Sequence, residues 1–424
     1  MRIGIQTWGT EGDIRPLAAL AAGLSTEGHE VTLVATSVEN KNYAHLGTTS
    51  GFRVQHAGQR RLSPRVLNNT IAKILGTVNP LRQLEHILVH LFDPVVEEML
   101  EAAYGLAADN DLVIGHFLVH PLVLAAEKHR RPHITVATVP LLPSMYFAPA
   151  GMPDFRATNE WIWAVAKFLI NAQMGKRVNG LRKREGLPAV RQIMHRVWAS
   201  PVLNLIAVSP SLCESPPDWE ERHCLSGFLN LPASADPWRI PSDLQNFFKA
   251  GPPPVFMGFG SMTTFADRRR LETATRIMCD AAVTAGCRAI VQSNWDGIEN
   301  IPKTPDIYQL TDAPHLDVFP RCAMVVHHGG AGTTQSATLA GCPSIVVPHA
   351  VDQVFWASKL RRIGIAPRQL LMRRLTVNRL TKRIRQVIGD PAMKRRAEQL
   401  GEKMKNENGV ETAIKHIEKA VKAH

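Results

Sequence analysis

The stretch that decides the fold is VVHHGGAGTTQSATLAG, residues 325–341. An apolar run ends in two histidines, three glycines let the backbone turn sharply, and two threonines open a helical pattern. The free N–H groups and the dipole at such a helix N-terminus favour an anion, so we expect a phosphate site here. The alternative is a structural turn with core histidines. The candidate residues are His328, Gly330, Gly332, Thr333 and Thr334.

Two further motifs follow apolar runs in the same half of the chain. PVFMGFGSM, residues 254–262, places Ser261 at the end of a strand, where its hydroxyl could meet a second phosphate. Asp352 and Gln353 follow the run PSIVVP, and an acid with an amide matches the paired hydroxyls of a sugar. The alternatives are a plain strand-to-helix turn for Ser261 and a helix N-cap for Asp352.

The first half of the chain opens on a related pattern, the apolar run RIGIQTW followed by GTEGDIRP. Asp13 lies where this first strand meets the first helix. A carboxylate there could deprotonate a hydroxyl group. Taken alone, Asp13 is also a good helix N-cap.

Short β-rich runs alternate with helical patterns in both halves, which predicts an α/β fold with two doubly wound, Rossmann-like domains. We expect the ligand in the cleft between the two domains, at the carboxyl ends of their strands. The composition changes near residues 231–254, which predicts an N-terminal domain at 1–235, a linker at 236–253, a second domain at 254–400, and a C-terminal helix within 401–424 that packs back on the first domain. The expected strands are 2–8, 30–35, 52–57, 111–115, 133–138, 288–292, 306–310, 323–327 and 344–348.

The composition excludes several classes of protein. The six cysteines form no C-x-x-C pair, which is typical of core thiols in a reducing compartment. No signal peptide opens the chain, and no apolar run reaches the ~20 residues of a spanning helix. We therefore expect a cytoplasmic protein.

The net charge is +12, and the segment from Lys359 to Arg385 holds ten Lys or Arg and no acid. A second basic cluster lies at residues 176–184. A solvated helix face or peripheral contact with an anionic membrane explains these clusters. No aromatic-interleaved or helix-turn-helix motif indicates nucleic acid.

Two other ligands are disfavoured by local context. Asp109 and Asp111 have the D-x-D spacing of metal-dependent sugar transferases, but they directly precede an apolar strand and so mark a helix-to-strand turn. We therefore expect no metal site. GTEGDI lacks the G-x-G-x-x-G spacing of nicotinamide-binding loops, and we expect no resident cofactor.

Together these motifs resemble the GT-B glycosyltransferases, and in particular the sterol 3-β-glucosyltransferases and the bacterial glycosyltransferases of macrolide and glycopeptide antibiotics. The resemblance covers nearly the whole chain through GTEGDIRPLAALAAGL, GHEVTLVAT, PPPVFMGFGSM, TDAPH, FPRCAMVVHHGGAGTT and GCPSIVVPHAVDQVFWA. It implies metal-independent transfer of a sugar with inversion at the anomeric carbon. The expected donor is UDP-glucose, and the expected transferred sugar is glucose. The partners it implies are a nucleotide sugar as co-substrate and a hydrophobic small-molecule acceptor.

The resemblance also implies a role for each motif. His328, Gly332 and Thr333 would contact the donor diphosphate, with Ser261 on its other side. The backbone of Ala313 would meet the uracil, Asp352 and Gln353 would hold the sugar hydroxyls, and Asp13 would be the catalytic base. The acceptor pocket is expected within residues 60–180, where the candidate apolar side chains are Met145, Tyr146, Phe147, Trp161 and Trp163.

The sequence departs from the family pattern at two points. Pro348-His349-Ala350-Val351 stands where sterol-type enzymes usually have P-F-F-G, and Ser336 stands where plant relatives have a ribose-binding Glu. Uridine and thymidine donors therefore both stay open. The alternative functions are transfer to a membrane lipid, a nucleotide-sugar epimerase, and a non-catalytic auxiliary homologue of a glycosyltransferase.

Overall fold

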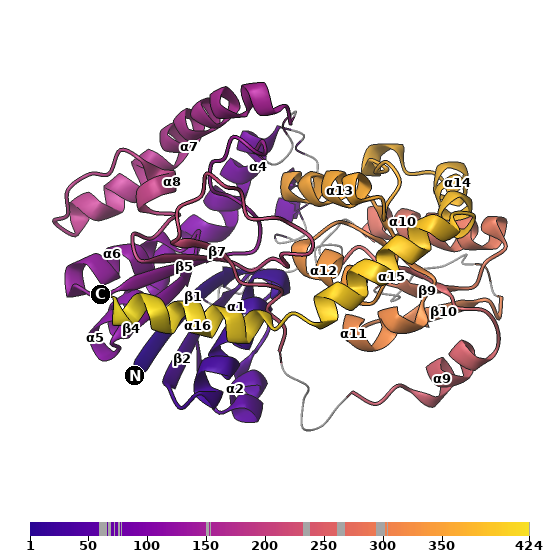
Figure 1. The fold of residues 1–424 in the computed structure, drawn as a ribbon, viewed down its shortest axis with the longest axis horizontal. Helices are drawn as coiled ribbons and strands as arrows, with labels where there is room; N and C mark the ends of the chain where they lie inside the picture. Colours follow the sequence, from indigo (N-terminus) through magenta and orange to yellow (C-terminus); the bar gives the residue numbers. More distant parts are fainter. Residues whose placement is uncertain are drawn as a thin grey trace. The chain divides into compact units, whose positions relative to one another are not determined.

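The computed structural model describes residues 1–58, 66, 69–71, 73–74, 77, 79–149, 152, 154–231, 238–260, 268–293, 302 and 304–423. The chain divides into two compact units. Unit 1 comprises Met1–Arg61, Thr77–Ala235 and Glu407–His424. Unit 2 comprises Asp236–Asn406 together with the described residues of Leu62–Gly76. Each unit is an α/β layer structure in its own right (Figure 1).

Unit 1 contains a parallel sheet of seven described strands in the order β3-β2-β1-β4-β5-β6-β7. Strand β1 lies at the point where the strand order reverses, between β2 and β4. The strands are β1 (Arg2–Gly9), β2 (Glu30–Ser37), β3 (Arg53–His56), β4 (Leu112–His116), β5 (His133–Ala137), β6 (Leu203–Ile206) and β7 (His223–Leu225).

Both faces of this sheet are covered, which explains why its central strands are apolar throughout. Successive residues of β4 show the two faces, because Val113 and Ile114 belong to different core clusters. The helices are α1 (Glu11–Thr26), α2 (Ala44–Ser50), α4 (Pro80–Ile87), α5 (Val96–Asp109), α6 (His120–His129), α7 (Arg156–Arg184), α8 (Ile193–Arg196) and α16 (Gly409–Lys422). A π-helical turn (Leu88–Phe92) and a 3-10 turn (Asp93–Val95) join α4 to α5.

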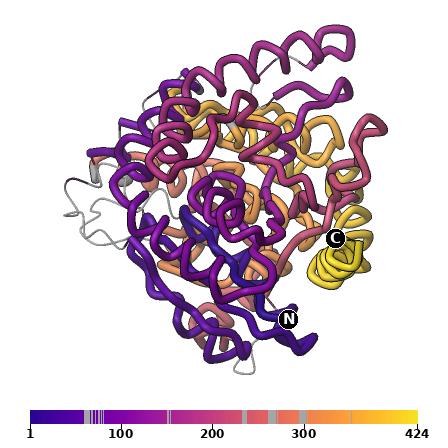
Figure 2. Tube along the Cα trace, turned by 90° about the vertical axis from the view of Figure 1, so that its left-hand side faces the viewer, coloured from indigo at the N-terminus to yellow at the C-terminus, as the bar shows by residue number. Residues whose placement is uncertain are grey.

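Helix α16 returns the chain to the unit that holds the N-terminus (Figures 1 and 2). It packs on α1 so closely that a Cβ atom on Gly23 would lie 2.2 Å from Cγ1 of Val410. Ile414 and Ile417 of α16 join the apolar cluster that contains Leu17 and Leu20 of α1.

Unit 2 repeats the architecture with a parallel sheet of five described strands in the order β10-β9-β8-β11-β12. Its strand order reverses between β8 and β11. The strands are β8 (Val255–Met257), β9 (Ala289–Gln292), β10 (Ile307–Leu310), β11 (Met324–His327) and β12 (Ser344–Val346). The helices are α9 (Ser242–Lys249), α10 (Arg268–Ala285), α11 (His315–Val318), α12 (Ala331–Leu339), α13 (Val351–Ile363), α14 (Val377–Ile388) and α15 (Pro391–Lys405), with 3-10 turns at Phe319–Arg321 and Met372–Arg374.

The predicted α/β class with two doubly wound sheets is confirmed, and the nine predicted strands coincide with β1–β5 and β9–β12 within two residues at either end. The segment expected as a linker differs from a plain connection. It contains helix α9, whose Leu244 is fully buried in an apolar cluster of unit 2. Residues 401–424 hold the end of α15 and all of α16, with a break between the two helices at residues 406–408.

Candidate functional site

Hydrogen bonds to His327 hold the loop between β11 and α12. This residue ends β11 and is fully buried. Its carbonyl accepts a hydrogen bond from Val347 N at 2.8 Å, and its Nδ1 accepts one from Gly329 N at 3.1 Å. Burial lowers the pKa of His327 to about 3, so the ring is neutral and can accept at Nδ1. His327 therefore shapes the turn.

The neighbouring His328 ring packs against Gly260 and Gly330, and a side chain at either position would collide with the ring. A Cβ atom on Gly260 would lie 2.6 Å from its Cε1, and one on Gly330 would lie 2.4 Å from its Nε2. Its Nδ1 has no hydrogen-bond partner in the described part of the chain. Burial, with His349 nearby, holds the pKa of His328 well below its usual range. A neutral ring with a nitrogen to spare is suited to donate one hydrogen bond to a ligand.

Helix α12 begins beside this ring without an internal cap. Its N-cap residue is Gly330, no side chain caps the terminus, and its first turn holds no acid. A Cβ atom on Gly332 would meet nothing within 4 Å, so the space beside this residue of the first turn is open. Thr333 is half-buried in this turn, and the Oγ1 of Thr334 is buried with no partner among the described residues. The terminus thus offers uncompensated N–H groups and a positive dipole end to an anion.

The terminus of α13 lies against the same loop but is capped. Gln353 Oε1 accepts hydrogen bonds from the backbone N–H groups of His349 at 2.6 Å and Ala350 at 3.0 Å. The Gln353 backbone also approaches the loop, because a Cβ atom on Gly329 would lie 3.1 Å from its carbonyl oxygen. The Gln353 oxygen is thus committed to its own helix, and only its amide N–H groups remain for a ligand. Asp352 is half-buried in the first turn of α13.

The remaining predicted contacts of unit 2 are less defined. Ala313 follows β10, is 9% exposed and joins the apolar cluster beneath the loop. Asp312, beside it, accepts a hydrogen bond from Gln292 Nε2 at 3.4 Å. Ser261 lies outside the described residues.

In unit 1, Asp13 is the third residue of α1 and closes a capping box with Thr10. Its Oδ2 accepts from Thr10 N at 2.9 Å and from Thr10 Oγ1 at 3.2 Å. The preceding Gly9 has φ +142° and leaves room for this carboxylate, because a Cβ atom there would lie 2.2 Å from Oδ2. Burial raises the pKa of Asp13 to about 6, against the opposing effect of the Thr10 hydrogen bonds. The carboxylate is therefore more basic than a free one.

Sequence reasoning missed the neighbour of this carboxylate, His116. It ends β4, the strand beside β1, and its Nε2 lies 3.7 Å from Asp13 Oδ1. The His116 side chain is 2% exposed, and neither ring nitrogen has a hydrogen-bond partner among the described residues. Burial lowers the pKa of His116 to about 3, so the ring is neutral. A histidine at the end of a strand next to the first one was the available signal, since parallel strand ends share one edge.

The apolar residues expected in the acceptor pocket lie in different surroundings. Phe147 packs edge-on against Trp163 of α7 at 6.1 Å and against Trp219 at 5.9 Å between ring centroids. Met145 and Tyr146 are 42% and 37% exposed, and Arg156 covers the Tyr146 ring. Trp161 of α7 is 77% exposed and faces away from the unit's core. Their role in acceptor binding stays a prediction.

Other predicted features have definite places. Asp109 ends α5 and Asp111 immediately precedes β4, so the D-x-D pair does mark a helix-to-strand turn. Asp111 accepts from Arg2 N at 2.9 Å and from the Arg2 side chain at 3.3 Å. Within the described ranges, no group of three His, Cys, Asp or Glu is arranged to hold a metal ion. All six cysteines are free. No described helix is both long and apolar enough to cross a membrane.

Comparison with known proteins gives a consistent picture. Residues 276–419 match the family model of the erythromycin biosynthesis protein CIII-like C-terminal domain. The chain is 30% identical over 443 residues to the O-mycaminosyltylonolide 6-deoxyallosyltransferase of Streptomyces fradiae, covering 99% of this chain and 97% of that protein. It is 28% identical over 438 residues to a sterol 3-beta-glucosyltransferase of Arabidopsis thaliana, covering 98% of this chain and 65% of that protein. It thus spans slightly less than two thirds of that relative's length.

Solved structures agree on the fold. The kitacinnamycin glycotransferase superimposes with a TM-score of 0.72 at 20% identity, covering 99% of this chain and 98% of that one. The glycosyltransferase VinC in complex with DTDP superimposes with a TM-score of 0.63 at 19% identity, covering both chains fully. With these likenesses and the relative in Streptomyces fradiae, the chain belongs to the GT-B glycosyltransferase family that includes the sterol 3-β-glucosyltransferases and the macrolide glycosyltransferases.

Proposed function

We propose that this protein transfers glucose from UDP-glucose to the hydroxyl group of a lipophilic acceptor such as a sterol, triterpenoid, macrolide or flavonoid, with inversion at the anomeric carbon. The observation that carries the proposal is the uncapped N-terminus of α12 beside His328. A helix end with open space and a spare imidazole nitrogen is an anion site, and a nucleoside diphosphate is the anion that a glycosyltransferase handles. The names of the sterol- and macrolide-specific relatives support the class of acceptor.

In the donor site, the N–H groups around Gly332 and Thr333, with His328, bind the diphosphate. Their role strengthens as the sugar leaves, because negative charge grows on the departing diphosphate. This preorganised site supplies the charge stabilisation without a metal ion. Asp352 and the amide N–H groups of Gln353 bind the sugar hydroxyls.

In the acceptor site, Asp13 acts as the general base. Its carboxylate takes the proton of the acceptor hydroxyl while the acceptor oxygen forms a bond to the anomeric carbon. The bond from that carbon to the diphosphate oxygen breaks, and UDP leaves with the electron pair. The raised pKa of about 6 suits this step, because the ionised carboxylate is populated at neutral pH and is a stronger base than an ordinary one. His116, 3.7 Å away, positions the carboxylate.

The test measures release of free UDP from UDP-glucose with and without a panel of hydrophobic alcohols, and the mass of each alcohol afterwards. We expect UDP release that depends on the alcohol, and an alcohol heavier by one hexose. A parallel series with TDP-glucose decides the nucleotide, and a phospholipid or lipid-linked acceptor in the panel tests the membrane-lipid alternative. Binding of UDP without turnover of any acceptor would contradict the proposal and favour an auxiliary homologue.

A further inference from the structure

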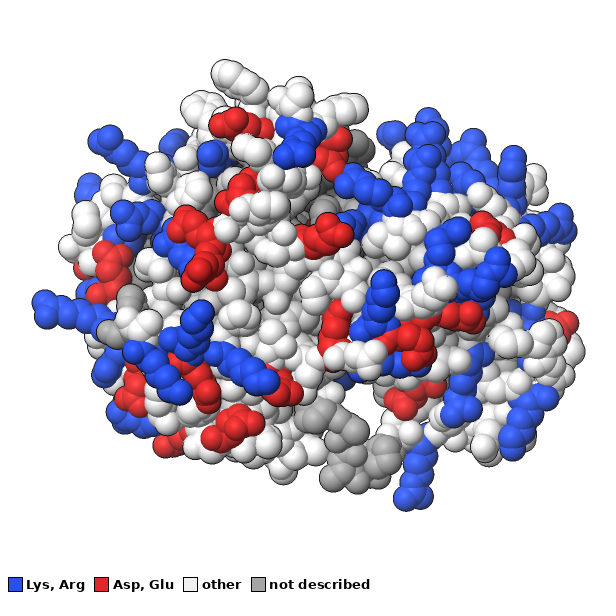
Figure 3. Space-filling view, viewed as in Figure 1, with Lys and Arg blue, Asp and Glu red and all other residues white. Residues whose placement is uncertain are grey.

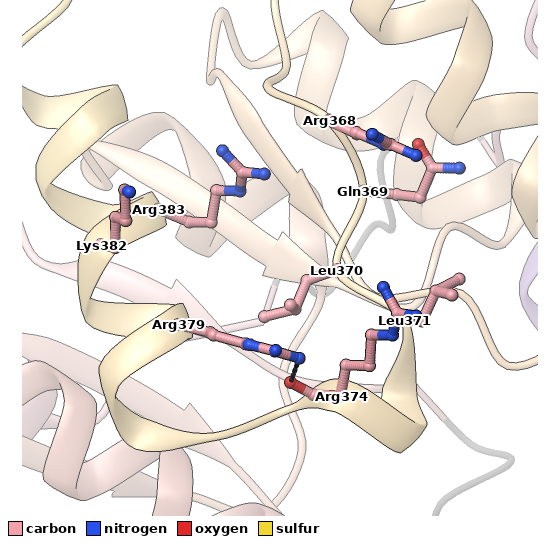
Figure 4. A pocket seen from close by; sticks show the side chains of 8 residues that line it. All are labelled: Arg368, Gln369, Leu370, Leu371, Arg374, Arg379, Lys382 and Arg383. Carbon is pink, nitrogen blue, oxygen red and sulfur yellow. Dashed lines mark hydrogen bonds between the residues drawn. The ribbon is translucent and has the colours of Figure 1, made fainter.

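Every charged side chain that lines one hollow of unit 2 is a cation. Five cations and three other residues surround a cavity of about 330 Å³ (Figure 4). We call this hollow the arginine pocket, and its lining residues are Arg368, Gln369, Leu370, Leu371, Arg374, Arg379, Lys382 and Arg383. An adjoining hollow of about 390 Å³ shares Arg368 and Gln369 and adds Ser358, Arg361 and Arg362.

The pocket is built by the segment that follows α13. Leu370 N donates to Val346 O at 2.9 Å, which ties this segment to the end of β12. The chain then turns through residues 372–374 into α14, and Arg379 Nη1 closes the turn by donating to Arg374 O at 3.3 Å (Figure 4). Helix α14 buries Leu380, Ile384 and Val387 on one face, so its basic residues lie along the other.

The described residues do not balance the charge of the pocket. No described Asp or Glu lines it, and the sequence has none between Lys359 and Arg385. None of the five cations that line the pocket forms an ion pair with a described Asp or Glu, whereas Arg276 and Lys394 of the same unit do. Lys and Arg side chains gather over α13 and α14 in the space-filling view (Figure 3). Like charges held this close repel one another, and a bound anion relieves the repulsion.

We propose that the arginine pocket binds a phosphate group, either that of a soluble phosphate compound or that of an anionic lipid headgroup. Guanidinium groups match phosphate oxygens in geometry and charge, and four of the five cations are arginines. Leu370 and Leu371 add an apolar wall. The residues are different from those of the α12 terminus, so this site is separate from the donor site and does not depend on the proposed function.

The test compares two variants that lose the same charge. The pocket variant carries Arg368→Gln, Arg374→Gln and Lys382→Gln, and it leaves the Arg379 hydrogen bond intact. The control variant carries Lys249→Gln, Arg395→Gln and Lys403→Gln, three exposed cations of the same unit outside the pocket. The probes are inorganic pyrophosphate, vesicles of phosphatidylcholine with phosphatidic acid, and vesicles of phosphatidylcholine alone. Calorimetric stoichiometry separates pyrophosphate bound in the pocket, which the pocket variant loses, from any pyrophosphate bound at the α12 terminus. Thermal unfolding reports that each variant is folded.

We expect the natural protein and the control variant to bind pyrophosphate or the acidic vesicles, and the pocket variant to bind about 100-fold more weakly, since each cation contributes about fivefold. Binding of pyrophosphate without vesicle binding identifies a soluble ligand, and preference for the acidic vesicles identifies a headgroup. The proposal is overturned if both variants weaken binding equally, or if the natural protein binds neither pyrophosphate nor the acidic vesicles.

Discussion

In each unit a central strand is followed by a helix that begins after a short turn, but the N-terminus is capped in one helix and uncapped in the other. Helix α1 begins Glu11-Gly12-Asp13, and Asp13 closes a capping box with Thr10. Helix α12 begins Ala331-Gly332-Thr333, with no acid in its first turn and no side-chain cap. Both have a glycine at the second position, where a Cβ atom would find open space or a single contact at 3.8 Å.

This difference separates two kinds of chemistry on one kind of scaffold. In unit 1 the carboxylates of Glu11 and Asp13 already compensate the positive end of α1, which disfavours binding of a further anion. The Asp13 carboxylate remains there as a candidate base. In unit 2 no acidic side chain in the first turn compensates the positive end of α12, so an anionic ligand can bind there. We therefore assign proton transfer to Asp13 of α1 and phosphate binding to the N-terminus of α12.

Removal of the α1 carboxylate should give the largest effect. Asp13→Asn keeps an oxygen that accepts from Thr10 but cannot take a proton, so we expect sugar transfer to fall about 100- to 10,000-fold. Binding of UDP, measured by calorimetry, should stay unchanged because that site belongs to unit 2. Near-normal turnover by the Asn variant would remove Asp13 from the mechanism.

Removal of the His328 imidazole, which lies in the loop before α12, should have the next largest effect. His328→Ala should weaken UDP binding about 10- to 150-fold, the contribution of one hydrogen bond to a charged group. His327→Ala is the matched control, because that ring accepts from Gly329 N inside the turn and should mainly lower the thermal stability of the protein. If the two variants bind UDP equally well, or if His327 proves the more damaging for binding, the wrong histidine has been assigned.

Much of this comparison could be predicted from the sequence, because it depends on local patterns. The apolar runs locate the strands, and a glycine turn followed by hydroxyls locates the α12 terminus. Contacts between distant segments could not be predicted. His116 reaches Asp13 only because β4 pairs with β1 across more than one hundred residues. The Gln353 oxygen caps its own helix, and the Trp161 ring of α7 faces outward. A pattern of a few residues does not distinguish either arrangement from a contact with a ligand.

The pH dependence of transfer tests the surroundings of Asp13. With a pKa of about 6, the base is ionised at neutral pH, and the rate should fall about tenfold for each pH unit below that value. The folded-state pKa is raised, so the stability that this group contributes is fully present below its unfolded value of 3.8 and is lost as the pH rises through about 6. Chemical unfolding of Asp13→Asn should lack this slope. An unchanged slope in the Asn variant would indicate another group.

Chelation should have the smallest effect, with no measurable change in rate. In the proposed mechanism the positive end of α12 and His328 stabilise the departing diphosphate, so transfer should persist in excess EDTA. The measurement is UDP release before and after chelation. Loss of activity that Mn²⁺ or Mg²⁺ restores would return attention to Asp109 and Asp111.

The contrast between the two helix N-termini is tested by adding one methyl group at the second position of each helix. Gly332→Ala and Gly12→Ala both enter space that the protein leaves open, so both variants should fold, with an unfolding free energy equal to or up to about 1 kcal/mol above the natural one. UDP is then titrated into each by calorimetry. We expect at least about tenfold weaker binding for Gly332→Ala, whose methyl group enters the open space beside the first turn of α12, and unchanged binding for Gly12→Ala. Equal affinity in the two variants, or a loss confined to Gly12→Ala, would contradict this expectation.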